Sequence, residues 1–303
     1  MLPTSSGSAA SAVPASSSPP TPRGTPMLKA RVITAIFLLI GFLAALFLLS
    51  PLGWTLLATV VAMLAAWEWG GLMRLVGIQR IAVALLLGVP CTTLMLAQPE
   101  ALGLSGSLDK GAALSLAWWF LLPALGFWTL LVPLWLVRRF PLSGTAFGLL
   151  TGAVVLLPTW LALVLLRHLG PWALLGIMAL VWIADIAAYF TGRAFGRRKL
   201  APQISPGKTW EGAYGAVAGV LIYGLAVYFL AGSAVILPVL LLIPTLLVLT
   251  AVSIIGDLFE SLLKRQAGIK DSSQLLPGHG GILDRIDSLT STLPLVTLLW
   301  LVL

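Results

Sequence analysis

The stretch GDLFESLLKRQAGIKDSSQLLPGHGGILDRIDS, residues 256–288, interrupts a chain that is otherwise poor in charge and rich in apolar runs. A glycine-rich turn, PGHGG at residues 277–281, lies between its two acidic ends. Its charged side chains are Asp257, Glu260, Lys264, Arg265, Lys270, Asp271, Asp284, Arg285 and Asp287. We therefore expect the rest of the chain to be arranged around this polar stretch.

Two predicted helix faces carry most of these carboxylates. Residues spaced i, i+3, i+4 and i+7 share one face of a helix. One such face holds Asp257, Glu260, Ser261 and Lys264, and a second holds Asp284, Asp287, Ser288 and Ser291. Carboxylates bind hard cations, whereas lysine, arginine and free backbone N–H groups bind phosphate oxygens. The pattern indicates a Mg²⁺-assisted reaction on phosphates.

The composition excludes a water-soluble globular protein. Hydrophobic residues make up 59% of the chain and charged residues only 9%, against about 45–50% and about 25% in soluble domains. A membrane-spanning helix needs about 20 apolar residues. We expect an all-α polytopic integral membrane protein with about nine transmembrane helices. They are predicted at 32–50, 52–69, 81–98, 114–136, 145–166, 171–190, 212–231, 234–253 and 287–303.

The acidic residues divide the chain into parts. Residues 1–26 are rich in Ser, Pro and Ala and are predicted to be a disordered tail. Seven of the ten acidic residues follow residue 180. We therefore expect residues 27–170 to be an N-terminal scaffold of five spans. Residues 171–303 would form the catalytic part, with four spans and two polar loops at 191–211 and 254–286.

The basic residues predict the orientation. With the N-terminus in the cytoplasm, 16 of the 18 Lys and Arg residues fall on that side, and only Lys110 and Arg167 fall outside. Cytoplasmic loops of membrane proteins are enriched in these residues. Both polar loops, and with them the active site, are thus predicted to face the cytoplasm. The same rule explains the net charge of +8, so we expect no nucleic acid partner.

Asp185 is a candidate site residue because it follows a long apolar run, residues 172–184. A carboxylate within a membrane span is costly and usually functional. The alternative is a structural ion pair with Arg193 or another basic residue. The sequence Gly207-Lys208-Thr209 is not a P-loop, because that motif needs glycine at the position of Pro202.

Three blocks resemble a known family. The pattern Ser261-x-Leu263-Lys264-Arg265, Lys270-Asp271, then His279-Gly280-Gly281-Ile282-x-Asp284-Arg285-Ile286-Asp287 resembles the signature of the phosphatidate cytidylyltransferases. Asp185-x-x-Ala188-Tyr189-x-x-Gly192-Arg193-x-x-Gly196 and Ser205-Pro206-Gly207-Lys208-Thr209-Trp210-Glu211-Gly212 are similar to two further blocks of that family. The family usually has Lys where this chain has Gly207, which leaves Lys208 as the main phosphate-facing candidate.

The resemblance and the residue chemistry together assign expected roles. Catalytic roles are expected for Lys208, Lys264, Arg265, Lys270, His279 and Arg285. Substrate binding is expected for Arg193, Ser205, Lys208, Gly280 and Gly281. The resemblance implies that Asp257 and Asp284 bind the metal ion, with Asp185 and Asp287 as further candidates. Asp287, like Glu260 and Asp271, could equally pair with a nearby basic residue. His279 is expected to contact phosphate or carry a proton.

The implied reaction joins phosphatidate and CTP to give CDP-diacylglycerol and pyrophosphate in phospholipid biosynthesis, with Mg²⁺ as cofactor. The expected partners are CTP, phosphatidate and membrane lipid, with a homodimer as a further expectation. The expected location is the bacterial inner membrane. One alternative is a nucleotidyl transferase acting on another lipid phosphate, such as a polyprenyl phosphate. The other is an ion-coupled transporter using Asp185 and Asp257, which the lack of an internal repeat disfavours.

Overall fold

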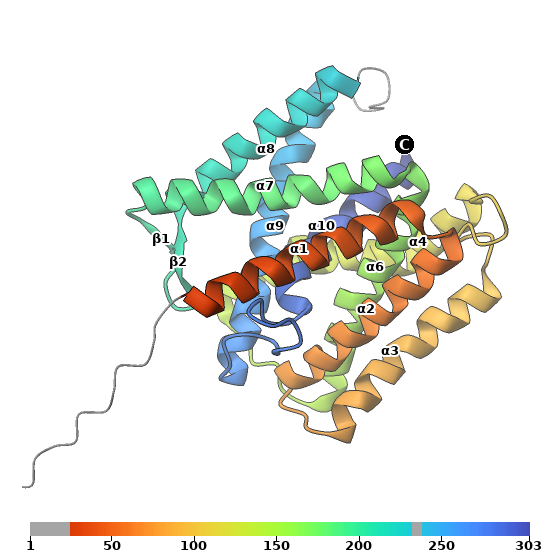
Figure 1. Ribbon diagram of the computed structural model, residues 1–303, viewed down its shortest axis with the longest axis horizontal. Helices are drawn as coiled ribbons and strands as arrows, with labels where there is room; N and C mark the ends of the chain where they lie inside the picture. The colour runs from red at the N-terminus through yellow and green to blue at the C-terminus, as the bar shows by residue number, and fades with distance from the viewer. Residues whose placement is uncertain (1–24, 232–237) are drawn as a thin grey trace, which may run out of the picture.

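The computed structural model describes residues 25–231 and 238–303, with side chains from residue 33 onward except that of residue 231. Most of the predicted tail, residues 1–24, and the start of the span predicted at 234–253 lie outside the described residues. The main helices are α1 Thr25–Leu48, α2 Pro51–Leu72, α3 Ile78–Ala97, α4 Lys110–Gly126, α5 Val132–Arg138, α6 Thr145–Leu166, α7 Pro171–Phe195, α8 Trp210–Ala231, α9 Val239–Ala267 and α10 Leu283–Val302. Figure 1 shows their arrangement.

The helices confirm the prediction of an all-α polytopic membrane protein. In the described ranges, seven helices are long and apolar enough to cross a membrane. The count of about nine spans is not confirmed. Of α1, whose side chains are described from Ile33, the segment Ile33–Leu48 is a shorter apolar helix, and α10 is not among the seven. The first turns of α10 carry Asp284, Arg285 and Asp287, and the helix is largely buried among the other helices.

A small antiparallel hairpin joins α7 to α8, whereas the sequence predicted only a polar loop at 191–211. Strand β1, Lys199–Ala201, pairs with β2, Ser205–Thr209. Pro206 and Gly207 disfavour a helix here, so an extended hairpin is the local solution. Figure 1 shows the hairpin at the end of the α7–α8 pair. The hairpin brings residues of the polar 191–211 loop next to α7, α8 and α9.

Small residues hold α7 and α8 close together. A Cβ added at Gly215 would lie 1.9 Å from Thr191 Oγ1, and one at Gly219 would lie 2.8 Å from Ala187 Cβ. Such close backbone approach is typical of helix pairs in membranes, where packing rather than hydrophobic burial drives association. The cytoplasmic loop predicted at 191–211 is thereby held at one end of a tight helix pair.

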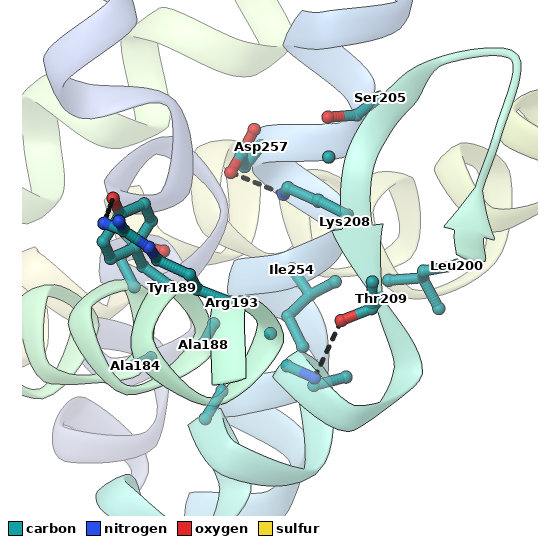
Figure 2. Close-up of a pocket in the computed structure, with 16 residues that line it drawn as sticks. Ala184, Ala188, Tyr189, Arg193, Leu200, Ser205, Lys208, Thr209, Ile254 and Asp257 are labelled. Carbon is teal, nitrogen blue, oxygen red and sulfur yellow. Dashed lines mark hydrogen bonds and ion pairs between the residues drawn. The ribbon is translucent and has the colours of Figure 1, made fainter. Parts of the chain in front are cut away.

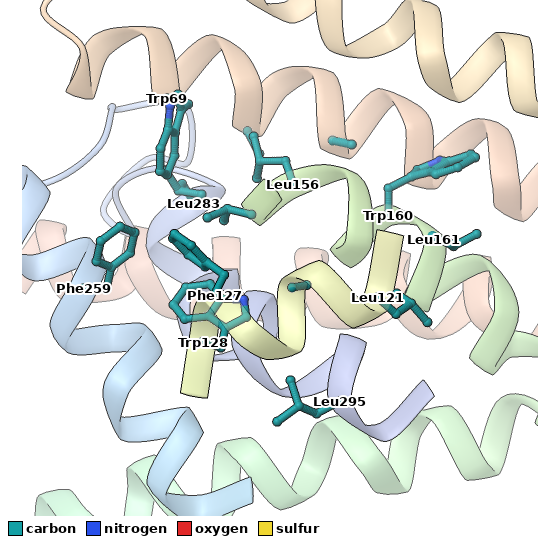
Figure 3. Close-up of a cluster of buried hydrophobic side chains, with 14 of the residues drawn as sticks. Trp69, Leu121, Phe127, Trp128, Leu156, Trp160, Leu161, Phe259, Leu283 and Leu295 are labelled. Carbon is teal, nitrogen blue, oxygen red and sulfur yellow. The ribbon is translucent and has the colours of Figure 1, made fainter. Parts of the chain in front are cut away.

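An aromatic cluster fixes the polar end of α9. Phe259 is 2% exposed and packs edge-on against Phe127, Trp128 and Trp135, with ring centroids 5.2–5.6 Å apart. Phe127 and Trp128 belong to a π-helical turn, η1 Phe127–Leu131, between α4 and α5. The wide turn precedes Pro133, which lacks the N–H that an α-helix needs. Figure 3 shows Phe259, Phe127 and Trp128 of this cluster beneath Leu283, the first residue of α10.

Helices α9 and α10 also approach each other closely. A Cβ at Gly256 would lie 2.4 Å from Ser291 Oγ and 3.0 Å from the Asp287 carbonyl oxygen. Glycine at this position therefore lets the two helices touch. The contact sets Asp257, the next residue on α9, beside the first turns of α10.

Candidate active site

A cavity of about 430 Å³ opens between α7, the β hairpin, α8 and α9. Its charged and hydroxyl-bearing lining includes five of the predicted site residues: Asp185, Arg193, Ser205, Lys208 and Asp257. Its apolar walls come from small or branched side chains: Ala184, Ala213, Ala216 and Ile254. Figure 2 shows charged groups from the hairpin and α9 facing this space. The cavity thus combines a charged end with an apolar wall.

A short ion pair crosses the cavity. Lys208 Nζ on β2 lies 2.5 Å from Asp257 Oδ2 on α9, and about a quarter of each side chain is exposed. Figure 2 marks this contact with a dashed line. The hairpin therefore delivers a lysine to a carboxylate that is almost 50 residues away in sequence. Both groups remain accessible to a ligand in the cavity.

Two further carboxylates lie near this pair. Asp185 of α7 and Asp287 of α10 are each close enough to Asp257 to repel it electrostatically, and Lys208 attracts both. In the described part of the chain no ion pair joins Asp185 to Arg193, which instead donates to the Tyr189 hydroxyl at 3.1 Å. Three carboxylates thus interact electrostatically with the Lys208 ammonium group, and the Arg193 guanidinium lines the same cavity.

Glu211 and Thr209 anchor the hairpin that carries Lys208. The Glu211 carboxylate accepts hydrogen bonds from the backbone N–H groups of Arg197, at 3.0 Å, and Arg198, at 3.2 Å. Thr209 Oγ1 accepts from Gly212 N at 3.1 Å and so caps the start of α8. These bonds fix both ends of the hairpin against the helix pair.

Replacing Thr209 by Val is expected to lower the free energy of unfolding by about 0.5–2 kcal/mol, because the shape is kept but the cap is lost. Thermal unfolding of the purified protein in detergent measures this. Thr92→Val is the matched control, since that exposed hydroxyl bonds only to its own helix, and we expect a change within about 0.5 kcal/mol. Equal losses in the two variants would contradict the cap.

A second charged network lies farther along α9. Lys264 Nζ is 2.6 Å from Asp284 Oδ1 and 3.3 Å from Glu260 Oε1. The other Asp284 oxygen accepts from Ser272 N at 2.9 Å, Ser272 Oγ at 2.9 Å and Gly281 N at 2.8 Å. Asp284 is therefore surrounded by protein donors, unlike Asp257. Asp287 lies between the two networks, because Glu260 and Lys264 also feel its charge.

Gly280 and Gly281 make room for this network. Gly280 has φ +83°, and a Cβ there would lie 2.8 Å from Asp284 Oδ2. A Cβ at Gly281 would lie 2.0 Å from Ser272 Oγ and 2.5 Å from Glu68 Oε1. Side chains are strained or blocked at both positions. Their predicted role in substrate binding stays a prediction, but the packing alone explains why both are glycine.

The remaining predicted residues lie outside the cavity lining. Arg265, Lys270 and Arg285 are exposed. His279 is half-buried, and its Nδ1 lies 3.4 Å from the Pro277 carbonyl oxygen. The structure therefore brings the predicted residues together in two groups, the cavity and the Lys264–Asp284 network, with these four residues in neither.

Sequence reasoning did not assign a role to Glu68, which is 0% exposed and reaches the 272–283 loop from α2. A lone carboxylate at the end of an apolar run was the available signal. Its hydrogen-bond partners are more than 200 residues away, so no local pattern could identify them.

The donor set around Asp257 is chemically suited to a hard cation. Among the described residues, no three His, Cys, Asp or Glu side chains already surround a common point that could hold a metal ion. The carboxylates of Asp185, Asp257 and Asp287 nevertheless influence one another electrostatically, and all three are near enough to Lys208 to be attracted by it. Oxygen ligands and excess negative charge are what Mg²⁺ requires.

Fold and site together define a polytopic membrane protein with a charged pocket between its helices. The pattern of the cytidylyltransferase family matches residues 29–303. The chain belongs to this family. It is 44% identical over 282 residues to a phosphatidate cytidylyltransferase of Pseudomonas aeruginosa, covering 90% of this chain and 97% of the relative. Enzymes of the same name from Haemophilus influenzae and Brucella suis are 37% and 39% identical, covering 88% and 89% of this chain and 96% and 92% of the relatives.

Proposed function

We propose that this protein transfers a cytidylyl group from CTP to phosphatidate, giving CDP-diacylglycerol and pyrophosphate for phospholipid biosynthesis. The observation that carries the proposal is the cavity with the Lys208–Asp257 pair at its charged end and an apolar wall beside it. A lipid phosphate needs charged groups around its phosphate and an apolar surface along its acyl chains. The names of the relatives support the same reaction.

The reaction needs no protein nucleophile. The phosphate of phosphatidate is itself an anion that can attack the α-phosphorus of CTP, and the bond to pyrophosphate breaks as the new P–O bond forms. The protein must bring two polyanions together and stabilise the charge that develops on the leaving group. Lys208 and Arg193 would bind phosphate oxygens, and Asp257 would hold the Lys208 ammonium in position.

Mg²⁺ is proposed as the cofactor, held by Asp257 together with Asp185 and Asp287, with Asp284 as the remaining predicted ligand. When bound, the ion would neutralise charge on the phosphates of CTP. Asp284 would have to exchange at least one of its present donors to serve as a ligand. The carboxylates near Asp257 are therefore the better-placed set.

The site is proposed to face the cytoplasm of a bacterial inner membrane. The predicted spans would put 16 of the 18 Lys and Arg residues on that side, which supports this orientation. CTP would then arrive from the cytoplasm while phosphatidate enters from the bilayer. The predicted homodimer stays a prediction.

The test uses purified protein in detergent with phosphatidate, Mg²⁺ and each of the four nucleoside triphosphates in turn. Of the four nucleotides, we expect only CTP to react with phosphatidate, giving pyrophosphate and CDP-lipid in equal amounts. A parallel reaction offers a polyprenyl phosphate in place of phosphatidate, and product there alone would identify another lipid acceptor. Absence of pyrophosphate with every acceptor would contradict a nucleotidyl transferase and favour the alternative of an ion-coupled transporter.

A further inference from the structure

Glu68 connects the N-terminal half of the chain to the loop that precedes α10. Its carboxylate, fully buried near the end of α2, has four hydrogen-bonding partners in that loop. Ser273 Oγ lies 2.6 Å and Ile282 N 2.9 Å from Oε1. Ser272 Oγ lies 3.0 Å and Leu283 N 2.6 Å from Oε2. One side chain thus holds both ends of the 272–283 loop.

All four of these partners can act as donors, which suits a carboxylate. An ionised carboxylate only accepts hydrogen bonds and has about four lone-pair sites. The N–H groups of Ile282 and Leu283 stand at the start of α10, where backbone donors have no partner within the helix. Ile282 occupies the N-cap position and has no side-chain acceptor of its own. Glu68 therefore caps α10 from a different helix.

The same contacts lead into the second charged network. Ser272 Oγ lies 3.0 Å from Glu68 Oε2 and 2.9 Å from Asp284 Oδ2, so its single hydroxyl proton lies between the two carboxylates and is donated to one of them at a time. Asp284 in turn pairs with Lys264. Gly281 packs so closely on Glu68 and Ser272 that no side chain fits there. A shift of Glu68 would therefore move Ser272, Asp284 and the first turn of α10.

We propose that Glu68 is a positioning residue for the active site. It fixes the 272–283 loop and the start of α10, and through them it places Asp284 and Asp287 relative to Asp257 on α9. Its effect on turnover rests on the function proposed above. The N-terminal half, predicted to be a scaffold, thereby takes part in building the site.

Glu68→Gln is the sharpest variant, because it is nearly isosteric but replaces one acceptor oxygen by an NH₂ group. The NH₂ group would then face an N–H or O–H donor of the loop, so that two donors meet and neither has an acceptor. We expect faster hydrogen exchange in residues 272–283, with exchange in the hairpin at 199–209 unchanged. We also expect kcat/KM for CTP to fall about 10²-fold, since a small misplacement of reacting groups has effects of this size.

The KM for CTP separates positioning from a loss of folded protein. A smaller folded fraction lowers the apparent kcat and leaves the KM unchanged, whereas misplaced groups raise the KM as well. Glu100→Gln is the matched control, since it makes the same substitution at an exposed carboxylate of the N-terminal half. If Glu68→Gln does not fold, Ser273→Ala removes one bond to the carboxylate and should show a smaller change of the same kind.

Unchanged loop exchange and an unchanged KM in the folded variant would overturn the proposal. The exchange measurement does not depend on the reaction. If the wild-type protein released no pyrophosphate, the proposed function would fail, while faster exchange in Glu68→Gln would still support Glu68 as the group that orders the loop.

Discussion

Replacing Asp257 by Asn is expected to reduce the rate of CDP-lipid formation by about 10²–10³ or more, the loss typical for one essential electrostatic contact. Asn keeps the size of the side chain but removes the charge that holds Lys208 at 2.5 Å. It also removes one of the three carboxylates proposed to hold Mg²⁺. Pyrophosphate release at saturating CTP measures the loss, and a Mg²⁺ titration should show a raised metal requirement.

The control for this prediction is Asp271→Asn, which changes an exposed carboxylate in the 270–283 region and should have a mild effect. Combining Asp257→Asn with Lys208→Met should be little worse than either single change, because paired groups act as a unit and their losses do not add. Near-normal, metal-dependent turnover in Asp257→Asn would contradict the assignment and place the metal with Asp185 and Asp287.

The helices and the family could be predicted from the sequence, because both depend on local patterns. Apolar runs ending at proline or glycine predicted helix positions closely: the run at 171–190 became α7, Pro171–Phe195. The hairpin at 199–209 was missed, since its strands are short and the bonds that anchor it come from Glu211 and Thr209 near the start of α8. Glu68 was visible as an isolated acid, but its partners depend on tertiary packing alone.

The two acidic helix faces show why residue spacing in the sequence could not predict how the site residues pair. Asp284 and Asp287 share one face of α10 as predicted, but they lie one turn apart and meet different turns of α9. Asp287 approaches Asp257 where Gly256 lets the helices touch, whereas Asp284 reaches Lys264. Sequence periodicity shows which residues share one face of a helix. Which turn of the neighbouring helix each of them meets depends on how the two helices pack.

Lys264→Met is expected to destabilise the protein by about 3–5 kcal/mol, the usual result of removing one partner from a buried ion pair. The Lys264 side chain is 12% exposed, and its partners Glu260 and Asp284 are 5% and 6% exposed. Neither Glu260 oxygen has a hydrogen-bond donor among the described residues, so the ammonium at 3.3 Å is its nearby counter-charge. Thermal unfolding in detergent measures the loss.

Adding Glu260→Gln to Lys264→Met should recover part of that stability. The double variant no longer buries an unpaired Glu260 charge, and Asp284 keeps its bonds from Ser272 and Gly281. Turnover should stay low in both variants, because the lysine predicted to act in catalysis is absent from each. If stability and turnover recovered together in the double variant, Lys264 would serve only to balance the buried carboxylates. If the single variant unfolded at the wild-type temperature, the buried ion pair would carry no such stability.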